Sequence, residues 1–211
     1  MKSLKLAGKN ISKSFVSGKV VLNNVSLELV NGDIHAVTGE NGSGKSTLLK
    51  IMCGVLRPTS GEIIFELNGE RIAHDRISSH VGFVSPYLNI YEEFTPVEHF
   101  RLISRIRGAT YNNEKADELL NKFNLFKRRN DAIRTFSSGM KQRVKYIISL
   151  LPEPQLLFLD EPTTNLDNDG ITSVLNSVFE HQSRGGAVVI ASNDEREISI
   201  CQKVISLAKN Y

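Results

Sequence analysis

Cysteine, tryptophan and long apolar runs are scarce or absent in this 211-residue sequence. There is no tryptophan, and the two cysteines, Cys53 and Cys201, have neither CxxC nor Cys/His spacing, so we expect two free thiols in a reducing compartment. No window approaches the roughly 18 uninterrupted apolar residues of a membrane-spanning helix. The first residues, MKSLKLAGKNISKSF, lack the apolar run of a signal peptide. The sequence therefore predicts a cytoplasmic protein that needs a partner to act on a membrane.

An excess of charge of one sign is also missing. The 26 Lys and Arg residues against 23 Asp and Glu residues give a formal net charge of +3. Nucleic-acid binding would call for Lys and Arg clustered on one face, so no nucleic-acid partner is expected. The length fits one domain with a proper core, and the 40% of hydrophobic residues is ordinary for a globular protein.

The alternation of short β-branched runs with longer helical patterns is typical of an α/β fold. Strands are expected at 20–25, 26–29, 33–38, 62–65, 80–84, 156–160, 187–191 and 203–208. Helices are expected at 45–56, 97–107, 113–123, 138–151 and 171–182. The first quarter is predicted to be hairpin-like, with a turn at Asn31 and Gly32. Between about 86 and 135 the pattern is helical throughout, which predicts a helical subdomain inserted into the α/β core.

The stretch GENGSGKST fits the phosphate-binding pattern G-x-x-x-x-G-K-[ST] and lies between an apolar strand, IHAV, and a helical segment, KSTLLKIM. Glycines let the backbone fold back so that successive N–H groups converge on phosphate oxygens, and the start of the helix adds a partial positive charge. We expect Lys45 to reach the β- and γ-phosphates and the Ser46 hydroxyl to bind Mg²⁺. The predicted nucleotide-binding residues are Gly39, Glu40, Asn41, Gly42, Ser43, Gly44, Lys45, Ser46 and Thr47.

A second stretch, LLFLDEP, places two carboxylates directly after four apolar residues. A buried strand would deliver Asp160 to its tip, where the carboxylate can hold a Mg²⁺-bound water. Glu161 can then orient or deprotonate the water that attacks the γ-phosphate. These two sites predict a nucleotide-hydrolysing enzyme, although they would also suit a nucleotide kinase or a GTPase.

The stretch FSSGMKQRVKYIISLL, just upstream of LLFLDEP, resembles the LSGGQ-type signature of ATP-binding cassette (ABC) proteins. Together with GENGSGKST and LLFLDEPTTNLD, the match covers essentially the whole chain, which is identified as a member of the ABC ATPase subunits. The short length of the chain and its signature sequence SSGMKQR resemble the small cassettes of ABC-2-type exporters, including those linked to haem export and cytochrome c maturation. The resemblance implies one nucleotide-binding domain over 1–211: a P-loop NTPase core with an N-terminal antiparallel β region and a helical subdomain at about 86–135.

In this family two cassettes face head to tail, and ATP lies between the P-loop of one and the signature of the other. The resemblance therefore implies a homodimer or cassette pair with bound ATP and Mg²⁺, the metal being held by Ser46 and Asp160. It assigns the signature to Ser137, Ser138, Gly139 and Met140, and the D-loop to Asn165, Leu166 and Asp167. It also places Phe15 where the family has an aromatic side chain that stacks on adenine.

Several positions depart from the family pattern. Ser138 and Met140 replace a glycine and a glutamine of the signature, but Gly139 is kept, so we expect a functional signature. Pro86 stands where the family has a glutamine that binds Mg²⁺, which predicts weaker metal binding or coupling unless Ser85 substitutes through water. Asn193 replaces a histidine that bonds the γ-phosphate, although its amide can still donate a hydrogen bond.

Asn193 leaves three readings open. The chain is a slow but competent ATPase that relies on Glu161, an ATPase active only in its full complex, or an ATP clamp with little hydrolysis. Because Lys45, Ser46, Asp160 and Glu161 are all present, we favour the first reading.

The resemblance also implies a membrane-spanning partner subunit, with the chain peripheral on the cytoplasmic face of the membrane. In this family the membrane subunit binds the cassette in the region that corresponds to YLNIYEEFTPVEHF. We therefore expect some of the apolar residues of this stretch to be exposed. These residues are Tyr87, Leu88, Ile90, Tyr91, Phe94 and Phe100. The alternative is a soluble ABC ATPase of an assembly machine, such as iron–sulfur cluster assembly. No regulatory domain is expected, since the last predicted strand ends close to Tyr211.

Overall fold

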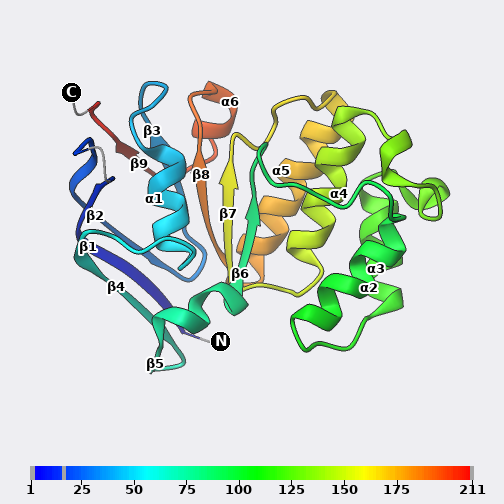
Figure 1. Cartoon of the computed structure of the whole chain (residues 1–211), viewed down its shortest axis with the longest axis horizontal. Helices are drawn as coiled ribbons and strands as arrows, with labels where there is room; N and C mark the ends of the chain where they lie inside the picture. Colours follow the sequence, from blue (N-terminus) through cyan, green and yellow to red (C-terminus); the bar gives the residue numbers. More distant parts are fainter. Residues whose placement is uncertain (1–2, 16–17, 210–211) are drawn as a thin grey trace.

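The chain folds around two β-sheets, as a computed structural model of residues 3–15 and 18–209 shows (Figure 1). Tyr211 lies outside the described residues. The four-stranded sheet has the order β2-β1-β4-β5, and its paired strands are antiparallel. The five-stranded sheet is parallel, in the order β6-β7-β8-β3-β9. The strands are β1 (Leu4–Ser14), β2 (Val20–Val30), β3 (Ile34–Thr38), β4 (Ser60–Leu67), β5 (Glu70–Ile72), β6 (Val81–Val84), β7 (Leu156–Asp160), β8 (Ala187–Ala191) and β9 (Lys203–Ser206).

Helices cover both faces of the parallel sheet. The helix α1 (Lys45–Met52) lies between the two sheets, while α4 (Ser138–Leu150) and α5 (Asn168–Ser183) cover the opposite face (Figure 1). Alternate residues of β7 belong to the two resulting cores. Leu156 and Phe158 pack in the core that holds α1, whereas Leu157 and Leu159 pack in the core that holds α4 and α5. The predicted α/β fold, with an antiparallel region beside a parallel sheet, is confirmed.

The N-terminal strands differ from the prediction. The strand β1 was not predicted, and the expected strands 20–25 and 26–29 form the single strand β2. Asn10 and Asn24 have positive φ angles of 51° and 53° and interrupt the hydrophobic alternation within each strand, and the pairing register shifts next to Asn10. The turn at Asn31 and Gly32 is present, but it joins strands of different sheets, so the hairpin is formed by β1 and β2.

Several element ends also differ from the expected ranges. The helix α1 ends at Met52 rather than at 56, because Gly54 leaves the helix with a φ of 78°. The helix α5 begins at Asn168, three residues early, because the Asp167 carboxylate accepts a hydrogen bond from Gly170 N and caps it. The short elements β5 and α6 (Glu195–Ile198) were not predicted.

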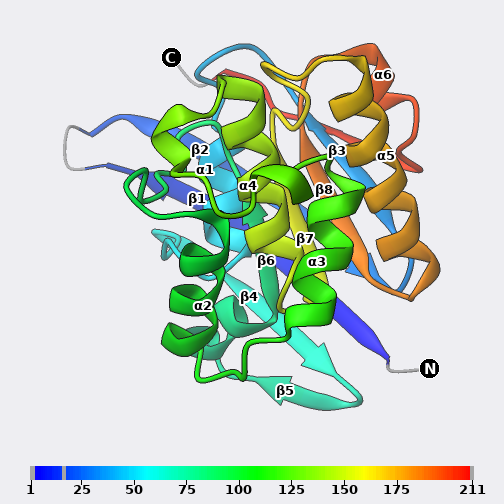
Figure 2. The same cartoon turned by 90° about the vertical axis from the view of Figure 1, so that its right-hand side faces the viewer.

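Between 86 and 135 the described chain contains helices and turns but no strand. The helix α2 (Pro96–Ile106) begins with a capping box between Thr95 and Glu98, and α3 (Asn113–Lys122) is capped by Asn112. Figure 2 shows these helices together with α4 from the right-hand side of Figure 1. Phe123, which follows α3, stacks on Tyr146 of α4 with a centroid distance of 5.8 Å.

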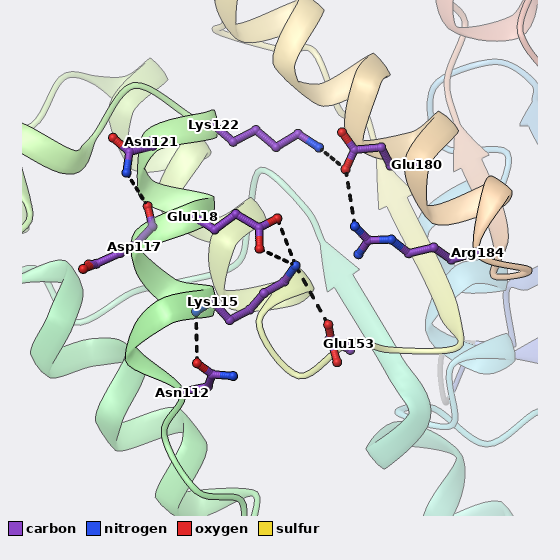
Figure 3. A network of polar contacts seen from close by, with 9 residues as sticks. All are labelled: Asn112, Lys115, Asp117, Glu118, Asn121, Lys122, Glu153, Glu180 and Arg184. Atoms are coloured by element: carbon purple, nitrogen blue, oxygen red, sulfur yellow. Dashed lines mark hydrogen bonds and ion pairs between the residues drawn. The ribbon is translucent and has the colours of Figure 1, made fainter.

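Ion pairs join α3 to the α/β core (Figure 3). Lys122 of α3 lies 2.8 Å from the Glu180 carboxylate of α5, and this hydrogen bond holds the pKa of Glu180 below its usual value. Lys115 reaches Glu118 at 3.0 Å and Glu153 at 3.9 Å. Ion pairs with exposed partners contribute about 0–1 kcal/mol each to the free energy of unfolding. The network therefore helps to orient α3 and is not a main source of stability.

Both cysteines lie in the described part of the chain. Cys53 and Cys201 are both free thiols. Within residues 3–15 and 18–209, no helix combines the length and the apolar character needed to cross a bilayer.

Candidate functional site

The predicted phosphate and carboxylate segments meet at one edge of the parallel sheet. Ala191 at the end of β8 pairs with Val37 of β3 on one side and with Asp160 of β7 on the other. The residues that follow these strand ends therefore lie side by side, and Glu161 N donates to Ala191 O at 2.9 Å. The crevice outside the carboxyl ends of parallel strands is where open α/β sheets bind ligands.

Two glycines of the loop between β3 and α1, Gly39 and Gly44, lie where an added Cβ would come too close to a neighbouring group. Gly39 has a φ of 145°, and a Cβ there would lie 2.5 Å from Leu207 O. Gly44 has a φ of 101°, and a Cβ there would lie 2.8 Å from the Leu22 side chain. These positions hold the loop close to its neighbours and turn it directly into α1.

The N-terminus of α1 is open to an anion. Among the described residues, no side chain hydrogen-bonds the first N–H groups of α1, and its first turn contains no acidic residue. The free N–H groups and the helix dipole therefore favour a bound phosphate. Lys45 adds a positive charge: it is buried, and its Nζ donates to Gly39 O at 2.6 Å and to Glu40 O at 3.3 Å.

Asn193, two residues after the end of β8, contacts the same loop. Its Oδ1 accepts a hydrogen bond from Gly39 N at 3.2 Å, so the oxygen of the Asn193 side-chain amide is bonded to the loop. The Nδ2 group is the part of this side chain that can donate to a phosphate oxygen. An exposed side chain at this position can thus hold the loop and face a ligand at once.

Asp160 and Glu161 differ sharply in environment. Asp160 is 2% exposed, and one of its oxygens accepts a hydrogen bond from Ser85 Oγ at 3.4 Å. Glu161 is exposed and has a φ of 47°, a left-handed conformation that costs a non-glycine residue roughly 1–2 kcal/mol. A buried carboxylate at the strand tip is suited to a metal or its water, and the exposed one beside it is suited to a reacting water.

The start of α4 and the segment before α5 pack against each other. Ser137 Oγ accepts a hydrogen bond from Met140 N at 3.2 Å and so caps α4. A Cβ on Gly139 would lie 2.8 Å from Asn165 O, so the two segments are in close contact. Arg143 hydrogen-bonds the Asp167 carboxylate, and this bond is the largest cause of a lowered pKa at Asp167.

The sequence model of one protein family, described as ABC transporter, matches residues 22–164, more than half of the chain. The chain belongs to the ABC transporter family. It is an ABC ATPase subunit, as the resemblance of its motifs implied.

Relatives and solved structures of this family cover nearly the whole chain. The lantibiotic transport ATP-binding protein SrtF of Streptococcus pyogenes is 33% identical over 190 residues, which cover 90% of this chain and 80% of SrtF. The lipoprotein-releasing system ATP-binding protein LolD of Buchnera aphidicola is 34% identical over 201 residues, which cover 90% of this chain and 87% of LolD. A solved structure described as the ATP-binding subunit of an ABC transporter superposes with a TM-score of 0.84 at 29% identity, over 97% of this chain and 86% of that one. These relatives favour the transporter subunit over the iron–sulfur assembly alternative.

Within this ABC cassette, sequence reasoning missed three donors on α4. Ser149 Oγ donates to Phe83 O at 2.8 Å, Lys145 Nζ to Pro86 O at 2.7 Å, and Tyr146 OH to Pro162 O at 2.9 Å. Burial lowers the pKa of the Lys145 ammonium and raises the pKa of the Tyr146 hydroxyl. The signal in the sequence was a set of polar groups among the apolar residues of this helix, and their partners are backbone carbonyls that no sequence motif identifies.

Phe15 remains a prediction. It follows β1, its side chain is exposed, and the Lys13 ammonium lies 5.3 Å from the centre of its ring. An exposed aromatic ring with a cation on it can offer a surface to a base.

Proposed function

We propose that this ABC ATPase subunit binds ATP on the loop 39–47, hydrolyses it with Glu161, and thereby drives a separate membrane-spanning subunit. The observation that carries the proposal is the convergence of four features at one sheet edge: an uncapped helix N-terminus, Lys45, a buried Asp160 and an exposed Glu161. The first two hold phosphates, and the other two serve the metal and the water.

The residues at the edge divide the chemistry among them. The backbone N–H groups of the loop and Lys45 hold the phosphates, and the Asn193 amide donates to the terminal one. Glu161 orients the attacking water and takes up its proton. The described residues contain no group of three His, Cys, Asp or Glu side chains able to hold a metal alone. Mg²⁺ suits such a site, since it usually binds one or two protein groups, here Ser46 and Asp160, together with phosphates.

Mg²⁺ would supply charge neutralisation on the phosphate oxygens. The serine and the aspartate would keep it beside Lys45. The Ser85 hydroxyl, which contacts Asp160, is positioned to support the site where Pro86 provides no ligand.

A second copy of the chain is part of this proposal. The loop 39–47 leads into α1, whereas the signature residues 137–140 begin α4 on the opposite face of the parallel sheet (Figure 1). Among the described residues, no hydrogen bond or ion pair joins the two segments. Ser137 and Ser138 are exposed, so they are free to face the ATP of a partner cassette while 165–167 lies at the seam. Residues 1–211 would then act as one nucleotide-binding domain, with 86–135 as its helical subdomain.

The surface after β6 fits the membrane partner. Tyr87, Tyr91 and Phe94 are 83%, 61% and 37% exposed, as predicted for part of this set, whereas Phe100 is buried. The rings of Tyr91 and Phe94 lie 5.6 Å apart, so they form a small aromatic patch. An exposed patch of this kind is typical of an interaction site, which supports a partner subunit docking here with the chain on the cytoplasmic face of the membrane.

The binding step is tested with a fluorescent ATP analogue and Mg²⁺. Loss of a hydrogen bond to a charged group costs about 1.5–3 kcal/mol, so Lys45→Ala is expected to weaken the Kd about 10- to 100-fold. Lys50→Ala, an exposed lysine on the same helix, is the matched control and should leave the Kd within about twofold. Equal affinity of the Lys45→Ala and Lys50→Ala chains would contradict the proposed site.

A further inference from the structure

Glu197 is a buried carboxylate to which the chemistry above gives no role. It lies on α6 and is 2% exposed. Its Oε1 accepts two hydrogen bonds from Thr163, one from the backbone N at 2.9 Å and one from Oγ1 at 2.5 Å. Burying a carboxylate is costly unless it is well bonded, and among the described residues the Glu197 Oε2 atom has no hydrogen-bond partner. A carboxylate kept buried against a single loop residue therefore calls for an explanation beyond packing.

Thr163 is two residues beyond Glu161, in a segment held from three sides. Glu161 N donates to Ala191 O of β8, and Tyr146 OH of α4 donates to Pro162 O. Glu197 completes the set by accepting both donors of Thr163. A non-glycine residue with a positive φ, such as Glu161, persists only where the surrounding structure fixes it.

The turn that carries Glu197 also touches the phosphate loop. Asn193, four residues earlier, accepts the hydrogen bond from Gly39 N, and Asp194 then caps α6 by accepting from Arg196 N. Residues 193–197 therefore contact the phosphate loop at one end and the segment after Glu161 at the other. This connects the two halves of the site within five residues of chain.

We propose that Glu197 is a positioning residue for hydrolysis: it holds Thr163 and thereby fixes the backbone of Glu161 relative to the phosphate loop. The inference rests on the proposed function, because it needs Glu161 to be the group that orients water. Glu197 is not among the residues proposed above to bind the nucleotide or to orient the water. Its effect is on the rate of the chemical step and not on the affinity for ATP.

The test compares Glu197→Leu, which removes the acceptor at similar size, with Glu197→Gln, which keeps an acceptor oxygen. Displacing a reacting group by about 1 Å costs on the order of 10²-fold, so Glu197→Leu should lower kcat at least about tenfold with KM for ATP within about twofold. Glu197→Gln should recover kcat to within about threefold of wild type, because an amide oxygen accepts the same bonds. Glu195→Leu, an exposed position on the same short helix, is the control and should match wild type.

Hydrogen exchange gives a readout that does not depend on turnover. In Glu197→Leu, amides of 161–167 should exchange about tenfold faster or more, while the phosphate loop 39–47 and the melting temperature stay near wild type. Thr163→Val, which loses only the hydroxyl donor, should show a smaller change in the same direction and covers the case in which Glu197→Leu does not fold.

The outcomes distinguish failure of the role proposed for Glu197 from failure of the proposed function. Unchanged exchange at 161–167, unchanged kcat, or a KM that rises in proportion to the loss of rate overturns the role of Glu197. A wild-type chain that hydrolyses no faster than Lys45→Ala contradicts the proposed function instead, and the exchange rates then still decide whether Glu197 holds the segment.

Discussion

Glu161→Gln should lower the rate of ATP hydrolysis about 10²- to 10⁴-fold, the range that a positioned general base contributes. The amide keeps the size of the carboxylate but cannot take a proton from water. The buried Asp160 beside it cannot replace Glu161, because its carboxylate is 2% exposed and already accepts the Ser85 hydroxyl. ATP binding should persist, since the loop 39–47 and Lys45 are untouched.

The control for this substitution is Glu153→Gln, at the other end of β7. Glu153 is also an exposed glutamate with a positive φ, 50° against 47° for Glu161, so a general effect of replacing such a residue would appear in both chains. Phosphate release measures kcat, and a fluorescent ATP analogue measures the Kd. A Glu161→Gln chain that keeps more than about half of the wild-type rate would remove Glu161 from the mechanism.

Gly139→Ala should lower the hydrolysis rate at least about tenfold without weakening the binding of ATP to the single chain. A Cβ at Gly139 would lie 2.8 Å from Asn165 O, so the start of α4 and the segment 165–167 must move apart. Overpacking of this kind costs typically about 1–3 kcal/mol. Both segments belong to the surface proposed to meet the second cassette, so the loss should appear in the reaction of the pair.

Alanine is a good helix former, so the helix itself should not suffer from this change. Glu114→Ala places the same residue at the corresponding second position of α3, where the side chain is exposed, and should leave the rate unchanged. The rates are compared over a series of protein concentrations. An equal rate for Gly139→Ala and Glu114→Ala at every concentration would show that this contact has no part in hydrolysis.

The phosphate loop 39–47 could be predicted because its conformation depends on residues that are close together in the sequence. The positive φ angles of Gly39, Gly42 and Gly44 and the helix that begins at Lys45 follow from residue types and spacing alone. The carboxylate pair was predictable for a related reason. An apolar strand followed by Asp160 and Glu161 determines which carboxylate is buried and which is exposed.

The residues that hold the site segments in place, such as Glu197 and Lys145, could not be predicted, because their contacts join residues far apart in the chain. Glu197 lies in EREI, where its neighbours Glu195 and Arg196 are exposed, and only the packed structure shows that it is buried on Thr163. Likewise, no sequence pattern indicated that Lys145 is buried, with its ammonium donating a hydrogen bond to the Pro86 carbonyl. The strand β1 was missed because Asn10 interrupts its alternation, and only pairing with β2 and β4 on both sides reveals it.

The most direct test of the whole account is the ATPase rate of the purified chain against its own concentration, with Lys45→Ala as the blank. Hydrolysis by a pair of cassettes predicts a rate that rises faster than linearly with protein concentration and stays above the blank, despite Asn193 and Pro86. A rate indistinguishable from that of Lys45→Ala at every concentration would contradict the account.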